Sequence, residues 1–162
     1  MKRGLLRPRI TLREASAADA PMLAAIHRGT FRHAWTDGDF VSFLSQKGVS
    51  ALIAFHTSRF GTTGPAGFVL FRQAADDSEI ITIAVRAAYR RRGVARRLME
   101  EAMRRLYHER AAALHLEVEA GNEPAVSLYR RLGFDEVGQR PAYYASDDEA
   151  RLPALVMRRQ LL

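Results

Sequence analysis

Apolar and polar residues alternate along several short stretches of the chain, which indicates β-strands. The pattern is clearest at residues 9–14, where Ile10 and Leu12 are flanked by polar residues. We expect further strands from alternating or β-rich runs at 49–55, 67–71, 80–85, 113–119, 134–138 and 154–157. Turns are expected at 61–65 and 76–78, because these segments are rich in Gly, Thr, Asp and Ser.

Apolar positions at helical spacing fill the segments between these strands. Residues 94–107 carry the strongest pattern, with Val94, Leu98, Ala102 and Leu106 on one face. Shorter helices are expected from Ser16 to about Phe31, after Thr36, and from Asn122 to Gly133. Strands and helices that alternate in the middle of the chain, with strands at both ends, predict an α/β fold whose mixed sheet has helices on both faces.

The composition is that of an ordinary globular domain. The 162 residues are 48% hydrophobic and 27% charged, which fits one domain over 1–162 and excludes a disordered or fibrous chain. The lack of cysteine excludes a disulfide scaffold and a cysteine nucleophile, and the five histidines show no metal-ligand spacing. No apolar run is long enough for a bilayer and no signal-peptide core is present, so we expect a cytoplasmic protein without a membrane partner.

The charge is strongly positive and unevenly distributed. The net charge is +7, and every cation except Lys2 and Lys47 is an arginine. Nine arginines lie between Arg86 and Arg110. This clustering favours one local site for an anionic ligand over a uniformly basic surface.

A basic, glycine-containing segment at 90–95 connects the expected strand 80–85 to the long helix. Free backbone N–H groups at a helix start bind phosphate, and Gly93 would let a ligand approach closely. Three side chains add positive charge there: Arg91, Arg92 and Arg96. The alternative is a basic helix start with solvated arginines. The segment is neither a Walker loop nor a dinucleotide fingerprint, because it has a single glycine.

The expected strand 113–119 has one apolar and one polar face. His115, Glu117 and Glu119 share the polar face. In an inner strand, such a face favours a ligand cleft, where a buried Glu117 could act as a general base. The alternative is an ordinary face in contact with solvent.

Three further residues have both a structural and a functional interpretation. Tyr129 is either a core residue or an acid for a thiolate leaving group. Asn122 caps a helix or holds an amide of a ligand. Trp35, the only tryptophan, is either a core anchor or the wall of a substrate groove.

Taken in order, these signals resemble the GNAT acetyltransferases. Arg90-x-x-Gly93-x-Ala95 fits the acetyl-CoA motif of that family, (Gln/Arg)-x-x-Gly-x-(Gly/Ala). A second string is similar to the RimI type, the ribosomal-protein-alanine N-acetyltransferases: Leu116-Glu117-Val118, Asn122, Leu128-Tyr129, Leu132-Gly133-Phe134 and Arg140-x-x-Tyr143-Tyr144. The resemblance covers about residues 9–160. One departure is Leu152-Pro153, where members often have an acidic residue, so the acceptor stays open.

The resemblance implies a GNAT fold, with a mixed, mostly antiparallel sheet of six to seven strands, a splayed parallel pair and about four helices. It implies acetyl-CoA as co-substrate, without a metal. The implied cofactor contacts are Ile83, Ala84, Val85, Arg91, Arg92, Gly93, Val94, Ala95, Arg96, Asn122 and Tyr129. The implied acceptor contacts are Trp35, Arg140, Tyr143 and Tyr144.

By the same resemblance, Glu117 is the base and Tyr129 the acid in direct acetyl transfer to a primary amine. The first candidate acceptor is the N-terminal α-amino group of a protein, such as a ribosomal protein. Three alternatives remain: a lysine side chain or small amine, an aminoacyl-tRNA acetylated by a toxin, and acetyl-CoA binding without catalysis. A nucleic-acid partner is not expected, because CoA phosphates account for most of the arginine cluster. A monomer or weak dimer is expected.

Overall fold

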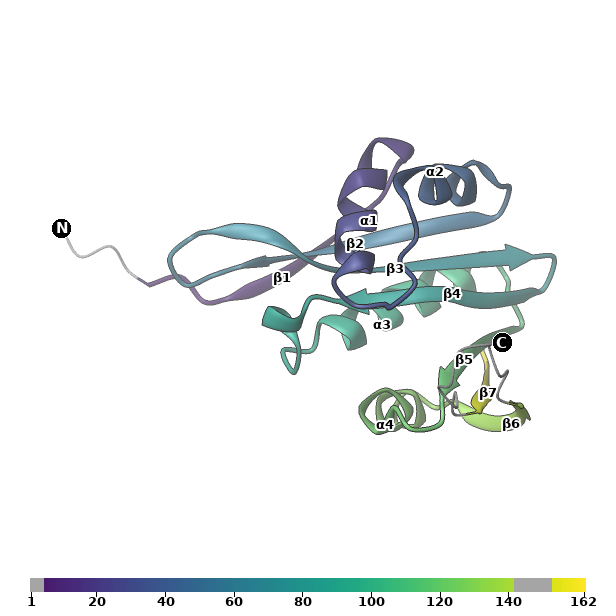
Figure 1. Ribbon diagram of the computed structural model, residues 1–162. Coiled ribbons are helices and arrows are strands. Elements are labelled where there is room, and N and C mark those ends of the chain that lie inside the picture. The colour runs from purple at the N-terminus through teal and green to yellow at the C-terminus, as the bar shows by residue number, and fades with distance from the viewer. Residues whose placement is uncertain (1–4, 142–152) are drawn as a thin grey trace. The chain divides into compact units, whose positions relative to one another are not determined.

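The computed structural model describes residues 5–141 and 153–162 (Figure 1). The strands are β1 Arg9–Glu14, β2 Val49–Thr57, β3 Thr63–Ala74, β4 Asp77–Val85, β5 Ala113–Glu119, β6 Asp135–Arg140 and β7 Ala154–Gln160. The α-helices are α1 Ala20–Arg28, α2 Asp37–Ser45, α3 Val94–His108 and α4 Glu123–Arg131, with short 3-10 turns η1 Ala17–Asp19 and η2 Ala87–Tyr89.

The strands form one mixed sheet in the order β1-β2-β3-β4-β5-β7-β6. β4 and β5 are parallel and pair over Asp77–Glu79 with Ala113–His115. The pairs β1–β2, β2–β3, β5–β7 and β6–β7 are antiparallel. The expected mixed sheet with a parallel pair is therefore confirmed. The chain divides into two compact units, Met1–Arg72 with Ile81–Ala102 and Gln73–Ile80 with Met103–Leu162.

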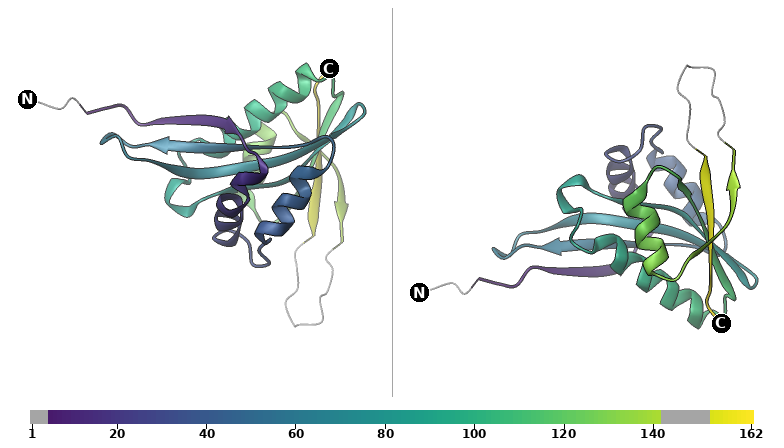
Figure 2. Two further views of the ribbon diagram at one scale, coloured as in Figure 1. Left: turned by 90° about the horizontal axis from the view of Figure 1, so that it is seen from above. Right: turned by 90° about the horizontal axis from the view of Figure 1, so that it is seen from below.

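In the first unit, α1 and α2 lie on one face of the strands (Figure 2). Their apolar sides are buried together with the inward residues of β2 and β3, as Leu23, Phe40, Ile53 and Phe68 show. Beyond these helices, β1, β2 and β3 continue as a projecting arm (Figures 1 and 2). The helices thus cover only the inner part of these strands.

Both expected N-terminal caps of this unit are present. At Ser16 and Thr36, the residue three positions on returns a carboxylate to the cap N–H, which completes a capping box. The first helix begins with a 3-10 turn and ends at Arg28, earlier than the expected Phe31, because the chain closes there in a tighter turn in which Thr30 N–H donates to His27 C=O.

In the second unit, β5 shows the expected alternation of apolar and polar sides. Leu114, Leu116 and Val118 are buried, whereas Glu117 and Glu119 are exposed. α4 begins at the expected Asn122 cap, whose side chain accepts a hydrogen bond from Ala125 N–H, and the chain turns at Gly133 with φ +89°.

The strand boundaries differ from expectation at two turns. β3 begins at Thr63, inside the expected 61–65 turn. The second turn occupies Ala75 and Asp76, so β4 begins at Asp77. Ala75 adopts a φ of +56°, a conformation that lets a very short connection reverse the chain. Within the described residues, no helix has the length and apolarity needed to cross a membrane.

Candidate active site

The loop before α3 presents a row of backbone N–H groups. Arg91 and Gly93 have φ values of +60° and +77°, which turn successive N–H groups toward a common side. The first helical hydrogen bond runs from Arg97 N–H to Gly93 C=O at 3.0 Å. Within the described part of the chain, none of the N–H groups of residues 91–96 donates to a protein atom. This arrangement suits an anion with several oxygens, such as a pyrophosphate.

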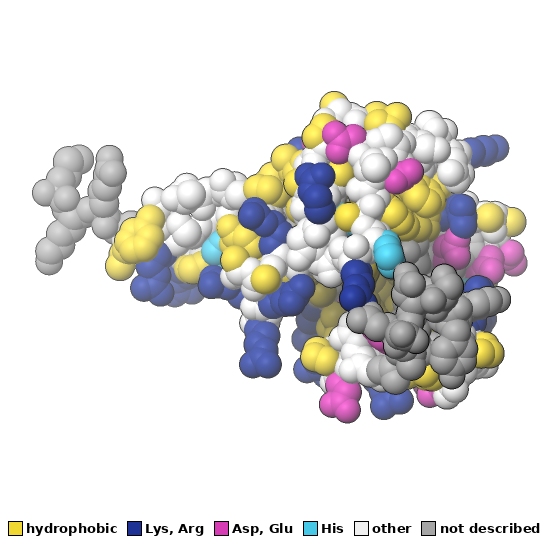
Figure 3. Space-filling model, viewed as in Figure 1, with side chains coloured by type: hydrophobic (Ala, Val, Ile, Leu, Met, Phe, Trp, Pro, Cys, Tyr) yellow, Lys and Arg dark blue, Asp and Glu magenta, His cyan; other side chains and the backbone are white. Residues whose placement is uncertain are grey.

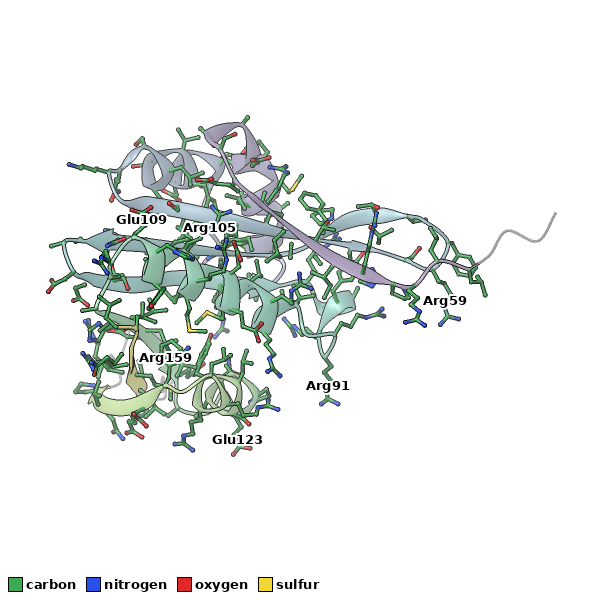
Figure 4. All side chains as sticks on the ribbon, turned by 180° about the vertical axis from the view of Figure 1, so that it is seen from behind. Arg59, Arg91, Arg105, Glu109, Glu123 and Arg159 are labelled. Atoms are coloured by element: carbon green, nitrogen blue, oxygen red, sulfur yellow. The ribbon has the colours of Figure 1, made fainter. Side chains whose placement is uncertain are left out.

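The side chains around this loop add positive charge without nearby acids in the sequence. Arg91 points away from the ribbon into solvent (Figure 4), and no Asp or Glu occurs between residues 80 and 99. Arg96 pairs with Glu100 at 2.7 Å, but both side chains are largely exposed. Exposed i,i+4 pairs are weak, so Arg96 can exchange this partner for a phosphate.

The end of β4 carries a backbone donor that faces away from β3. Arg86 N–H donates to Ala66 C=O of β3 at 2.8 Å. Because successive N–H groups of a strand point to opposite edges, the N–H of Val85 points away from β3. The Val85 N–H therefore makes no hydrogen bond to β3.

Gly67 holds β3 close to this end of β4. A Cβ atom on Gly67 would lie 2.6 Å from the carbonyl oxygen of Ala84 and 3.2 Å from Cα of Val85. Gly67 is not among the site residues expected from the sequence. Its signal was available, because a glycine inside a strand often marks a close approach of two backbones.

Glu117 lies on the exposed face of β5 and forms an ion pair. Its Oε1 is 2.6 Å from Nε of Arg140, and the two side chains are 43% and 67% exposed. On the same strand, His115 Nδ1 lies 2.9 Å from Asp77. The structure thus joins two expected site residues, Glu117 and Arg140, and leaves the carboxylate exposed, as the alternative of a solvent-facing strand face predicts.

Tyr129 is buried in α4, with a side chain that is 6% exposed. Its ring packs edge-on against Phe134, with centroids 5.9 Å apart. Burial raises the pKa of Tyr129 to about 12, because an ionised phenol loses its hydration there. Its hydroxyl makes no hydrogen bond with any residue the structure describes. Tyr129 therefore stays protonated at neutral pH with its proton still available.

For Asn122 and Trp35, the structure bears differently on the two interpretations given from the sequence. The Asn122 side chain accepts a hydrogen bond from Ala125 N–H at 3.3 Å, as a helix cap does. Its NH₂ group is left for a ligand, so the two interpretations are compatible. Trp35 is partly buried and stacks on His27 and Phe43, each with centroids 4.8 Å apart. These contacts favour the core-anchor interpretation.

His27 fixes the backbone at Trp35. Burial lowers the pKa of His27, so its ring is neutral at neutral pH. Its Nδ1 can then accept the Trp35 N–H at 3.1 Å.

Each of the two units contains some of the expected site residues. The first unit holds Trp35, the β4 end at 83–85 and the loop 91–96, and the second holds Glu117, Asn122, Tyr129 and Arg140. Tyr143 and Tyr144 lie outside the described residues. Among the residues that the structure describes, no group of His, Asp and Glu could hold a metal ion.

Known proteins match this chain over most of its length. Residues 20–134 match the acetyltransferase (GNAT) family. The chain is 32% identical over 152 residues to an N-alpha-acetyltransferase of Saccharolobus solfataricus, which covers 89% of this chain and 91% of that protein. It is 29% identical over 147 residues to the ribosomal protein bS18-alanine N-acetyltransferase of Escherichia coli, covering 91% and 95% of the two chains.

The fold is also that of a solved relative. The crystal structure of the ribosomal-protein-S18-alanine N-acetyltransferase from Escherichia coli superposes with a TM-score of 0.81 at 27% identity, over 94% of each chain. The resemblance to the RimI type is thereby confirmed in sequence and in fold. A match over more than half of the residues, together with the acetyl-CoA motif in a loop of free N–H groups, assigns this chain to the GNAT family of acetyltransferases.

Proposed function

We propose that this protein transfers the acetyl group of acetyl-CoA to the N-terminal α-amino group of a protein. The observation that carries the proposal is the row of free N–H groups at residues 91–96, which suits the pyrophosphate of CoA. Relatives named for N-terminal and alanine acetylation support the choice of acceptor. A ribosomal protein that begins with alanine is the first acceptor to test.

The cofactor contacts follow from the donors of each unit. The N–H groups of residues 91–96 bind the pyrophosphate, with Arg91 and Arg92 adding charge. The NH₂ of Asn122 donates to a carbonyl of the pantetheine arm. The N–H of Val85 donates to the thioester oxygen, where negative charge develops as the amine attacks.

Glu117 receives the proton of the acceptor amine. An α-ammonium has a pKa of about 7.7–8.0, against about 10.4 for lysine. Deprotonating lysine therefore requires roughly 3.5 kcal/mol more at a given pH. A carboxylate that already binds the guanidinium of Arg140 can bind an ammonium group in its place. The lower pKa of the α-ammonium favours the α-amine over lysine as the acceptor.

Tyr129 donates a hydrogen bond to the departing sulfur. As the new N–C bond forms, the C–S bond breaks and its electron pair remains on the thiolate. An ordinary thiol has a pKa of about 8.5, well below the value of about 12 for Tyr129. Complete transfer of the phenol proton is uphill by roughly 5 kcal/mol. Tyr129 thus stabilises the thiolate by a hydrogen bond, and the thiolate takes its final proton from solvent.

The decisive experiment measures CoA-thiol release with two peptides. One begins with a free alanine, and the other is its N-terminally blocked copy with an internal lysine. Release with the free peptide alone supports the proposal, whereas release with the blocked peptide makes lysine the acceptor. No release with either contradicts α-amine transfer and directs the search to small amines and aminoacyl-tRNA. The cytoplasmic location and the monomeric or weakly dimeric state remain predictions.

A further inference from the structure

The end of the arm carries a group of exposed apolar side chains, which we call the arm tip. It comprises Leu5, Leu6 and Phe60, whose side chains are 66%, 58% and 81% exposed. Leu6 N–H donates to Arg59 C=O at 3.0 Å, so the segment before β1 lies against the β2–β3 connection. The Leu6 side chain also reaches to 3.8 Å from where a Cβ on Gly61 would lie. The segment before β1 and the β2–β3 connection, which are far apart in sequence, therefore lie side by side.

Arginines lie beside the arm tip. Arg7, Arg9 and Arg59 are all exposed, and Arg59 projects from the ribbon (Figure 4). None of the three guanidinium groups pairs with a residue in the described ranges. No Asp or Glu occurs in residues 5–13 or 56–66. In Figure 3, hydrophobic side chains occupy the left end of the arm, with Lys and Arg directly beneath them.

We propose that the arm tip docks on the surface of an anionic lipid bilayer. Leucine and phenylalanine side chains enter the boundary between headgroups and acyl chains, where they leave water. Arginines beside them contact lipid phosphates, each contributing about 1 kcal/mol near an anionic surface. The arm tip offers both kinds of group on a convex projection, which can enter a deformable surface without a matching pocket.

Two other partners fit the arm tip less well. A specific protein interface buries about 800 Å² on each partner, which is more than three side chains at the end of a hairpin supply. A single-stranded nucleic acid would stack its bases on rings, but only Phe60 of the three is aromatic. A lipid surface uses aliphatic and aromatic side chains alike.

This inference does not depend on the proposed acetyl transfer. The arginines at the arm tip are distinct from those of the phosphate-binding loop at 91–96. The sequence alone predicted no membrane partner, because Leu5 and Phe60 are brought together only by the pairing of β1 with β2. The apolar runs that contain Leu5 and Phe60 are too short to be detected in a search for membrane-spanning segments.

The test is sedimentation of the full chain with vesicles. We expect binding to vesicles of phosphatidylcholine with one third phosphatidylglycerol, and little binding to phosphatidylcholine alone. Phe60→Ser should weaken binding about tenfold to a hundredfold, because one large apolar side chain no longer leaves water. Arg59→Gln should weaken it about fivefold. Higher salt should weaken binding of the parent chain.

Matched controls change exposed residues elsewhere. Val137→Ser removes another exposed apolar side chain, on β6, and Arg130→Gln removes an exposed arginine of α4. Both should bind vesicles like the parent chain, and all four variants should melt like it. Absent binding to anionic vesicles, or binding unchanged by Phe60→Ser, overturns the proposal. So does Phe60-dependent binding of an RNA oligomer that competes with the vesicles, which would assign the arm tip to nucleic acid.

A second measurement reports how deeply the arm tip enters the bilayer. Phe60→Trp places an indole at the arm tip, and the parent chain, with Trp35 as its only tryptophan, supplies the background. The additional emission should move to shorter wavelength on anionic vesicles and be quenched by brominated lipids. Emission that stays unchanged while the protein sediments with vesicles would place the contact elsewhere on the molecule and refute the inference.

Discussion

The Nε of Arg140 lies 2.6 Å from Oε1 of Glu117, so a cation already occupies the carboxylate assigned as the base. Arg140 reaches this partner across β7, whose Ala154 and Val156 pair with Arg140 and Glu117 respectively. Exposed pairs of this kind contribute at most about 1 kcal/mol. In the proposed mechanism, a substrate ammonium therefore displaces Arg140 at little cost, and until then the pair keeps the carboxylate in place.

Replacing Glu117 by Gln should remove the base with little effect on folding. We expect kcat/KM for an alanine-first peptide to fall at least about a hundredfold near pH 7. Activity should partly return as the pH passes about 8, because the peptide amine then loses its proton to solvent. The measurement is a pH series of thiol release, and a loss that is equal at every pH would count against the assignment.

Arg140→Gln is the partner variant for this experiment. It frees Glu117 without removing the carboxylate, so turnover should stay within a few fold of the parent chain and the KM for the peptide should not rise. Thermal melts of both variants should agree with the parent within about 1 kcal/mol. A loss in Arg140→Gln as large as that in Glu117→Gln would show that Arg140 itself is needed in the reaction.

Tyr129→Phe should lower kcat about tenfold to a hundredfold, because one hydrogen bond to the thiolate is lost. The affinity for acetyl-CoA should not change, since the ring and its contact with Phe134 remain. With a pKa of about 12, Tyr129 stays neutral up to about pH 11, so its ionisation causes no decline in activity of the parent chain between pH 7 and 10. Single-turnover rates check both points, and unchanged turnover would exclude Tyr129 from the chemistry.

Gly93→Glu should abolish acetyl-CoA binding, measured by calorimetry. The glycine has a φ of +77° and open space where a Cβ would lie, so the fold tolerates the residue at a cost of about 1–2 kcal/mol. The added carboxylate then repels phosphate from the N–H groups of residues 91–96. Gly61→Glu is the matched control, because Gly61 also has a positive φ, of +86°. It should bind acetyl-CoA normally, and equal losses in both variants would contradict the phosphate site.

Asp19→Asn should reduce stability in a pH-dependent way. Arg13 donates two hydrogen bonds of 2.9 Å to this carboxylate, and they hold the pKa of Asp19 at about 2, below its usual 3.8. A lowered carboxyl pKa stabilises the fold above about pH 4, and the gain is lost as the pH falls toward 2. We expect the free energy of unfolding to drop by about 1–2 kcal/mol at pH 7 and by little at pH 2.

The control for Asp19 is Asp39. Its carboxylate accepts the Thr36 N–H at 2.8 Å in an equivalent capping box, without an arginine partner among the described residues. Asp39→Asn should therefore lower stability by about 0.5–1 kcal/mol, the contribution of a cap. Denaturant titrations of both variants between pH 2 and 7 make the comparison. Equal losses would show that Arg13 adds nothing.

Local signals in the sequence predicted most of the elements. The alternation over 113–119 matches β5 residue for residue, and Thr36 and Asn122 cap helices as expected. The motif at 90–95 predicted the loop whose backbone N–H groups have no acceptor among the described residues, because glycine and helix-start chemistry are local properties. Boundaries at Thr63 and Asp77 were wrong because strand pairing extended the strands into turn-forming residues.

Contacts between residues far apart in the chain could not be predicted from the sequence. The pairing of Glu117 with Arg140 depends on the register of β5, β7 and β6, which no local pattern specifies. The arm tip likewise depends on the pairing of β1 with β2.

The close approach at Gly67 bears on how this enzyme can vary through evolution. Any side chain at position 67 would collide with the Ala84 carbonyl, so β3 and β4 would have to separate. Such a separation would shift the Val85 amide, which we propose as the oxyanion donor, and such a donor acts only within a narrow range of distances. Position 67 should therefore be as intolerant of substitution as a reacting residue. If the activity of every single variant were measured, position 67 would therefore score as essential, although glycine has no side chain that could take part in the reaction.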